Sequence, residues 1–360
     1  MGSRRRCRRR GNPRGASPAA TPARAAACHD ELPLTKFLLR RLLNSLILVM
    51  IATSLAYVLA GVSLKPRSHY EGRNPPPPAA VTDALLTARN INDKTPILQR
   101  FGRWAGGVVH GDFGRTWNGG SVNAEMGRRI AVSLRLLLIG TIVGGLLGVL
   151  AGAWSAVRQY KVSDHAITLL SFAVLSTPVF VLAVLLEVVA IGFNNAIGAK
   201  FFEYTGDVSP GLQGGFFTHL ADRVQHLVLP TFTLILAQLA IISRYQRSAM
   251  LDVLGSDYVR TAQAKGLRRR DALFKHALRT ALIPSATLFV YSFGLLLVSA
   301  TFTEKIFGWH GMGEWFVDSI TESDINAVAA VTCFAALLVL IAGLLSDVAY
   351  ALLDPRVRVD

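Results

Sequence analysis

The chain has 360 residues, of which 51% are hydrophobic and 17% charged, and its formal net charge is +15. A mean hydropathy of +0.39 is too high for an ordinary soluble protein and indicates a polytopic membrane protein. The charge does not favour nucleic-acid binding, because the basic residues gather in the N-terminal tail and between apolar runs. The three cysteines, Cys7, Cys28 and Cys333, have neither zinc-site spacing nor a disulfide pattern.

Residues 1–34 differ in composition from the rest of the chain. An arginine block is followed by a stretch rich in proline and alanine. Such a segment cannot bury enough apolar surface to fold, so we expect a disordered cytoplasmic tail. Attraction to nucleic acid or anionic lipid is the functional alternative. A solvated extension, or a start codon assigned too early, is the plainer interpretation and the preferred one.

Six apolar runs follow the tail, and most have the length that crosses a bilayer. About 20 residues at 1.5 Å rise span a hydrocarbon core of about 30 Å. A period-2 alternation is absent, so the runs predict helices rather than a membrane barrel. The fourth run is the shortest and contains Pro230. The runs are 42–62, 131–154, 167–191, 227–243, 281–302 and 327–353.

The charges between the runs predict the orientation of the chain. The segment 244–280 carries nine basic residues against three acidic ones, whereas 303–326 carries five acidic residues and only Lys305 as a base. The positive-inside rule then places 244–280 and both termini in the cytoplasm. The basic segment 63–130 would lie outside, where the rule is weak because the loop is long.

This topology divides the chain into five parts. After the tail 1–34 we expect a first transmembrane helix within 35–62 and an extracytoplasmic segment at 63–130. A five-helix core at 131–353 includes the cytoplasmic loop 244–280, and a cytoplasmic tail at 354–360 ends the chain.

The second apolar run contains four glycines spaced four residues apart, which form overlapping GxxxG steps. Small residues on one helix face allow a second helix to approach closely. We expect packing within this subunit. The alternatives are packing against a second membrane subunit and simple tolerance of glycine in a membrane helix. These candidate packing residues are Gly140, Gly144, Gly148 and Gly152.

The most informative segment is the basic, amphipathic stretch 256–284. Ser256 is the predicted N-cap of a short helix, and Asp257 places negative charge at the positive end of its dipole. Gly266 is predicted to end that helix, because a left-handed residue is easiest without a Cβ. Asp271 is predicted to cap the next helix, which leads into the fifth run.

One face of the short helix carries Tyr258, Val259 and Ala262. A patterned polar helix in a cytoplasmic loop is typical of helix-in-groove docking on a soluble partner. An ordinary solvated basic loop is the alternative.

The order of residues in this loop resembles the cytoplasmic "EAA" loop of ABC importer permeases, in the dipeptide/oligopeptide/nickel branch. Arg260-Thr261-Ala262 stands in the E-A-A place, and the matching segments are 257–262, 264–267, 276–279 and 283–284. The resemblance implies that the loop binds a separate ATPase. The candidate coupling residues are Asp257, Tyr258, Val259, Arg260, Thr261, Ala262, Ala264, Lys265 and Gly266.

Further segments resemble the same family at 98–115, 176–180, 304–313 and 347–356, although the family's usual motif after the first span is missing at 61–66. The resemblance implies an all-α polytopic membrane protein with six transmembrane helices and the ABC importer type I permease fold. It also implies a multi-pass place in the cell membrane, a second homologous permease subunit, two P-loop ATPase subunits and an extracytoplasmic solute-binding protein. Dipeptides, oligopeptides and nickel chelates are the implied solutes, with peptides preferred.

Motifs for chemistry within the chain are missing. There is no GxxxxGK[ST], HExxH or GxSxG sequence, and the eight histidines are dispersed. We therefore predict a permease rather than an enzyme, with no catalytic residue, cofactor or metal site, and with ATP hydrolysis on partner subunits. A stand-alone secondary transporter or channel is the main alternative, and a membrane anchor or assembly factor is a third. The sequence selects no substrate-binding residue.

Overall fold

The computed structural model describes residues 34–353. The predicted tails at 1–34 and 354–360 therefore lie outside the described residues, except for Leu34, which is helical. Within the described part every regular element is helical, and the one β-bridge joins Arg115 and Ser121. The long helices are α1 (Leu34–Ser63), α5 (Val122–Val157), α6 (Val162–Ser176), α7 (Val179–Ile197), α8 (Phe216–Leu254), α11 (Arg279–Ile306) and α13 (Ile325–Leu353).

Five of these helices, α1, α5, α7, α8 and α13, are long and apolar enough to cross a membrane, judged over the described residues. The fifth predicted run lies within α11, which has 28 residues. The all-helical, polytopic membrane fold is therefore confirmed. The elements also extend beyond the predicted runs, because polar residues at their ends continue the helix into water.

The third predicted run is not one helix, which corrects the sequence-based prediction. Residues 167–191 fall on α6 and α7, and the chain breaks between them at Thr177 and Pro178. Thr177 is extended, with φ −96° and ψ 124°, because the ring of a following proline disfavours the helical region. Pro178 lacks an N–H and stands directly before the first turn of α7.

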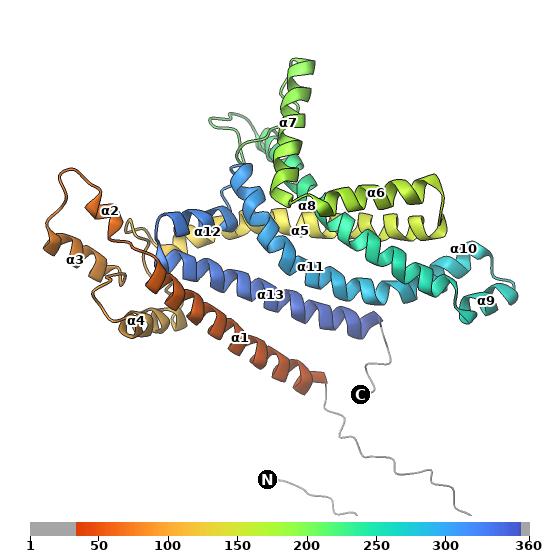
Figure 1. The fold of residues 1–360 in the computed structure, drawn as a ribbon, viewed down its shortest axis with the longest axis horizontal. Helices are drawn as coiled ribbons and strands as arrows, with labels where there is room; N and C mark the ends of the chain where they lie inside the picture. The colour runs from red at the N-terminus through yellow and green to blue at the C-terminus, as the bar shows by residue number, and fades with distance from the viewer. Residues whose placement is uncertain (1–33, 354–360) are drawn as a thin grey trace, which may run out of the picture.

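The long helices pack as neighbours rather than as a closed ring. Figure 1 shows α5 and α8 side by side, with α11 beside α8 and α13, and α1 beside α13. One cluster of buried residues joins α1, α4 and α13 around Tyr57, Trp104 and Ile325. Another joins α5, α8 and α11 around Leu136, Leu234 and Leu296.

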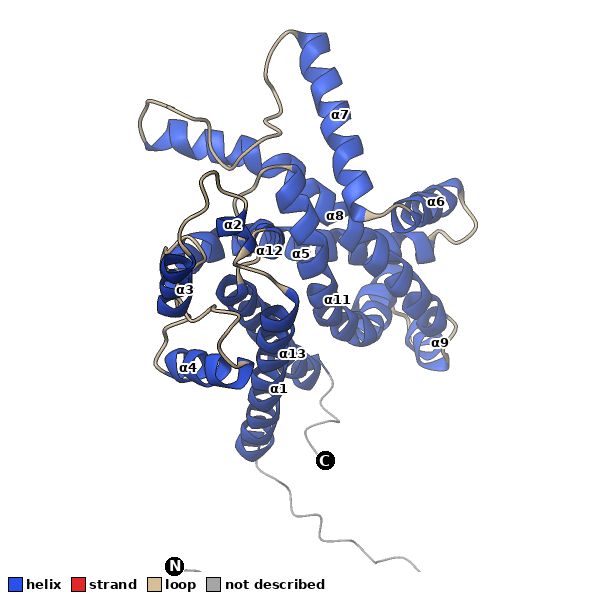
Figure 2. Cartoon of the chain, turned by 60° about the vertical axis from the view of Figure 1, so that its left-hand side comes forward, coloured by secondary structure: helices blue, strands red, loops and turns tan. Residues whose placement is uncertain are grey.

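The segment between α1 and α5, whose local structure the sequence does not predict, forms three short helices. They are α2 (Ser68–Glu71), α3 (Ala79–Ala88) and α4 (Ile97–Val109). Helices α3 and α4 each begin directly after a proline, Pro78 and Pro96, where a missing N–H costs little. Figure 2 shows these helices gathered at one side of the molecule, away from α9 (Asp257–Ala264).

The remaining described elements follow α9 and α11. They are α10 (Arg269–Ala272), the π-helical turn η1 (Leu273–Leu278) and α12 (Met312–Thr321).

Candidate coupling site

The predicted short helix of the basic loop is α9, and it is attached closely to α8. Only Gly255 and Ser256 separate the end of α8 from the start of α9. Val259 is 2% exposed and joins a buried cluster with Ala156 of α5 and Met250 of α8. The same cluster contains Ala277 of η1 and Ala281 of α11. One apolar side chain therefore anchors α9 to the ends of three longer helices.

The two ends of α9 agree only partly with the predicted caps. Ser256 occupies the N-cap position with extended backbone, but its hydroxyl donates to the Val253 carbonyl oxygen at 2.5 Å instead of accepting from α9. Asp257 lies in the first turn, where a carboxylate complements the helix dipole. Ser256 is thus at the predicted N-cap position, but its side chain does not make the predicted capping hydrogen bond. The carbonyl of Val253 at the end of α8 accepts the hydroxyl instead.

Gly266 closes α9 with a reversal that glycine adopts most easily. Its φ is +92°, in the left-handed region, and an added Cβ would meet no atom within 4 Å. The Gly266 N–H donates to the Gln263 carbonyl at 2.9 Å, and the Leu267 N–H donates to the Ala262 carbonyl at 3.3 Å. These paired bonds are those of a Schellman motif. The backbone conformation, rather than crowding, favours glycine here.

The solvent-facing side of α9 is polar and basic. Ala262 is half-buried beside the anchoring Val259, whereas the side chain of Tyr258 lies outside the described residues. The exposed candidate residues are Asp257, Arg260, Thr261, Ala264, Lys265 and Gly266. The helix thus offers a charged outer face while its inner face holds it to the membrane helices.

The chain beyond Gly266 differs from the prediction for Asp271. The next helical stretch already begins at Arg269, and the Ala272 N–H donates to the Arg268 carbonyl at 3.0 Å. Asp271 therefore lies inside the first turn and is not the N-cap. From Arg269 the chain runs through α10 and η1 into α11 without a non-helical residue.

The four glycines of α5 face α8, the helix that carries α9. A Cβ on Gly140 would lie 2.9 Å from the Leu234 Cβ, and one on Gly148 would lie 2.8 Å from the Ile242 Cβ. On Gly152 it would lie 2.4 Å from the Ser243 carbonyl oxygen. These approaches are too short for a side chain. Gly144 is similarly close to Gln238 and the Ile235 carbonyl.

A partly buried ion pair, which sequence reasoning missed, ties α6 to α8 near α9. Arg247 Nε lies 2.7 Å from Asp164 Oδ1, and Nη2 lies 2.9 Å from Oδ2, so the contact is bidentate. The Ser155 hydroxyl and the Tyr160 N–H also donate to this carboxylate. The partners are 83 residues apart, and no local pattern connects them.

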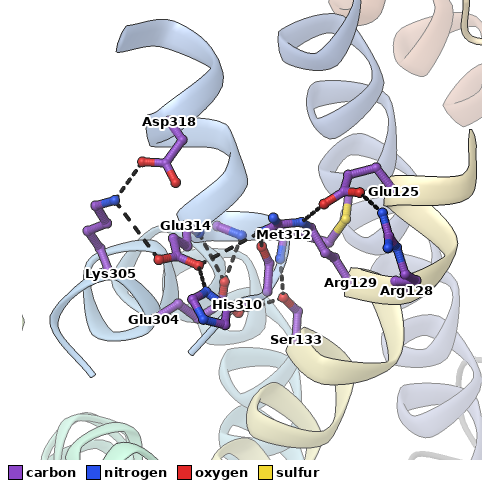
Figure 3. A network of polar contacts seen from close by, with 12 residues as sticks. Glu125, Arg128, Arg129, Ser133, Glu304, Lys305, His310, Met312, Glu314 and Asp318 are labelled. Carbon is purple, nitrogen blue, oxygen red and sulfur yellow. Dashed lines mark hydrogen bonds and ion pairs between the residues drawn. The ribbon is translucent and has the colours of Figure 1, made fainter. Parts of the chain in front are cut away.

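A second polar network lies at the other end of α11, in the 304–313 segment. Glu304 accepts hydrogen bonds from the Gly313 N–H at 2.7 Å, the Glu314 N–H at 3.1 Å and the Ser133 hydroxyl at 2.5 Å (Figure 3). The carboxylate thereby caps α12 and joins it to α5. A Cβ on Gly311 would lie 2.5 Å from this carboxyl group. The glycines of the motif thus permit the close approach.

Comparisons with known proteins identify the family to which the chain is similar. Residues 145–359 match the family described as binding-protein-dependent transport system inner membrane component. The oligopeptide transport system permease protein OppB of Mycobacterium tuberculosis is 55% identical over 326 residues, which cover 91% of this chain and 100% of that protein.

Two more distant relatives have similar names. The oligopeptide transport system permease protein AppB of Bacillus subtilis is 35% identical over 278 residues, covering 77% of this chain and 84% of that protein. The dipeptide transport system permease protein DppB of Escherichia coli is 32% identical over 292 residues, covering 76% and 85%. From the family match over most of the helical core and from these identities, it follows that this chain belongs to the family of binding-protein-dependent transport system inner membrane components.

Proposed function

We propose that this chain is the permease subunit of an ATP-driven importer of peptides and that α9 is its contact with a cytoplasmic ATPase. The peptide class rests on the names of the relatives, which are oligopeptide and dipeptide transport permeases. The single observation that carries the coupling role is how α9 is attached to the rest of the chain. Val259 holds it to the ends of the membrane helices while its charged face stays exposed.

The proposed assembly contains a second, homologous permease, two P-loop ATPases and an extracytoplasmic solute-binding protein. Helix α9 would lie in a groove of one ATPase, with Asp257, Arg260, Thr261, Ala264 and Lys265 at the contact. Helix-in-groove docking uses a short amphipathic helix in this manner. ATP hydrolysis belongs to the ATPases, and this chain supplies half of the translocation path.

Two contacts would transmit a movement of α9 to the membrane helices. The Val259 cluster joins α9 to the ends of α5, α8 and η1–α11. The pair of Asp164 and Arg247 then holds α6 to α8. A displacement driven by the ATPases would therefore move these helix ends together, which is the rigid-body rocking that alternating access requires.

The proposed orientation places α9 in the cytoplasm and the 63–130 segment outside. The basic loop on one side and the acidic 303–326 segment on the other support it. Both termini are then cytoplasmic.

Affinity purification of the tagged chain from its native cells in mild detergent, followed by mass spectrometry and an ATPase assay, tests the proposal. The wild type should recover ATPase subunits with hydrolytic activity. Arg260→Glu reverses a charge on the exposed face of α9 and should reduce their recovery severalfold. Arg103→Glu reverses another exposed charge, on α4, and is the matched control that should retain them. A homo-oligomer without ATPase, or equal recovery by both variants, would contradict the coupling role and favour a stand-alone transporter.

A further inference from the structure

A cavity of about 570 Å³ lies beside the last turn of α1, at the end of the molecule away from α9. Its wall includes Gly61 and Val62 from α1, the residues just after that helix, and the start of α4. The function proposed above does not use this cavity. Four of its lining residues are basic, and they are Lys65, Arg67, Lys94 and Arg100.

Arg100 is the most unusual group in this wall. It is 5% exposed, yet no described carboxylate forms an ion pair with it. Its Nη2 donates to the Gly61 carbonyl oxygen at 3.3 Å, and its Nε has no hydrogen-bond partner in the described part of the chain. A buried guanidinium without a counter-ion is unfavourable, so an anion in the cavity would stabilise it.

Of the other three basic residues in the wall, Arg67 and Lys94 form ion pairs with described carboxylates and Lys65 does not. Arg67 lies 2.7 Å from Asp83 and 2.6 Å from Asp93, and Lys94 lies 2.6 Å from Asp83. Lys94 and Arg67 hold the pKa of Asp83 below its usual range, and Arg67 does the same for Asp93. Both carboxylates are thus ionised, and they neutralise these two cations. Lys65 is exposed and pairs with none of the described acidic residues.

One further acidic residue, Glu71, also lines the cavity, and its side chain is exposed to water. It lies on α2, whereas Arg100 lies on α4. Glu71 and Arg100 form no ion pair. The positive charge available to a ligand therefore comes from Lys65 and Arg100, and the exposed Glu71 opposes it in part.

The cavity lies where the apolar surface of α1 ends. Leu55, Leu59 and Val62 follow one another at helical spacing and are 65%, 69% and 70% exposed. This stripe belongs to a helix that is long and apolar enough to cross a membrane, and Val62 both ends it and lines the cavity. The basic groups therefore lie at the level where hydrocarbon gives way to lipid headgroups.

We propose that this cavity binds the phosphate of an anionic membrane phospholipid. Lys65 and Arg100 hold the phosphate oxygens, and the acyl chains lie along the Leu55–Val62 stripe. Inorganic phosphate carries the same charged oxygens, but it has no apolar part to contact the stripe. The exposed stripe is therefore the reason for proposing a lipid rather than a soluble anion.

Native mass spectrometry of the full chain in mild detergent tests this site. The wild type, titrated with dioleoylphosphatidylglycerol, should bind it more tightly than dioleoylphosphatidylcholine, which has the same acyl chains. Lys65→Gln should weaken phosphatidylglycerol binding about fivefold, since one cation near a membrane surface contributes on that scale. Arg100→Gln should weaken it at least as much, because it removes the buried cation from the wall. Arg103→Gln, on the same helix but outside the cavity wall, should bind like the wild type.

Thermal unfolding separates loss of the site from loss of the fold. Lys65 is exposed, so Lys65→Gln should keep the wild-type Tm without lipid even if Arg100→Gln does not. Equal binding of the two lipids by the wild type, or unchanged binding by Lys65→Gln, would overturn the proposal. Stabilisation by inorganic phosphate without any effect of phosphatidylglycerol would also overturn it, because the ligand would then be a soluble anion.

Discussion

At the scale of single residues, the candidate site shows which features a sequence reveals. Gly266 could be identified because a lone glycine after an amphipathic octet is the usual signal for a helix end. The inward position of Val259 follows from helical spacing. The hydroxyl of Ser256 could not be assigned, because it binds the Val253 carbonyl, which is available only once α8 has ended. The contact between Asp164 and Arg247 depends entirely on tertiary packing.

Replacing Gly266 with valine should uncouple transport while the protein still inserts into the membrane. A β-branched residue at φ +92° costs about 1–2 kcal/mol or more, because its Cβ opposes the left-handed backbone. The C-terminal turn of α9 would then shift. Uptake of a labelled peptide into cells, and ATP hydrolysis by the purified complex, measure the effect.

Gly255→Val is the control for this substitution. Gly255 lies before α9 with φ −80°, which a valine can adopt, and an added Cβ would meet only the Asp252 carbonyl oxygen at 4.0 Å. Transport should be closer to normal in this variant. Wild-type uptake by Gly266→Val would remove the basis for assigning the turn a coupling role.

At the scale of elements, the pairing of α5 with α8 is the most extensive contact between the described helices. The GxxxG spacing indicated a helix partner, but a single sequence does not identify which helix that is. The structure places α8 along this face, with the helices close enough to exclude side chains at each of the four glycines. The division of 167–191 into α6 and α7 was missed, since continuous hydropathy hides a break at Thr177 and Pro178.

Gly152→Ala should destabilise the protein by about 1–3 kcal/mol, which is the usual cost of overpacking a tight contact. The added methyl would lie 2.4 Å from the Ser243 carbonyl oxygen, so α5 and α8 would have to separate. Thermal or denaturant unfolding in mild detergent measures the change in stability.

Gly127→Ala tests the same exchange on the same helix without the contact. Gly127 is exposed, and a Cβ there would meet no atom within 4 Å. This variant should be neutral or stabilised by up to about 1 kcal/mol, because alanine favours a helix. Equal unfolding midpoints for the two variants would show that close packing at Gly152 contributes nothing to stability.

At the scale of the whole molecule, the sequence indicated the helical membrane fold and the approximate place of each apolar run. The length of an apolar run can be read from the sequence alone, without knowing which helices pack against it. The arrangement of α2, α3 and α4 could not be obtained that way, because their buried residues, such as Trp104, meet partners on α1 that only the folded chain brings near. The proposed orientation rests on charge and invites a direct test.

Single cysteines in a background without Cys7, Cys28 and Cys333 should label from opposite sides of the membrane. Gln263→Cys places an exposed thiol on α9, and Arg73→Cys places one in the segment after α1. In intact cells whose outer layers are permeable to it, a membrane-impermeant maleimide should react with the second and not the first. Opened cells should label both. The reverse pattern in intact cells would invert the orientation.

The length of α8 has a geometric consequence for α9. At 1.5 Å per residue its 39 residues extend about 58 Å, whereas the hydrocarbon core is about 30 Å thick. Much of the helix therefore stands clear of the lipid tails and fixes where α9 is carried. Each residue added or removed in this protruding part would turn α9 by about 100° around the α8 axis, away from its Val259 anchor. Changes close to whole numbers of turns, such as about seven residues, would nearly restore its direction. The protruding part of α8 is therefore constrained in rotation as well as in length.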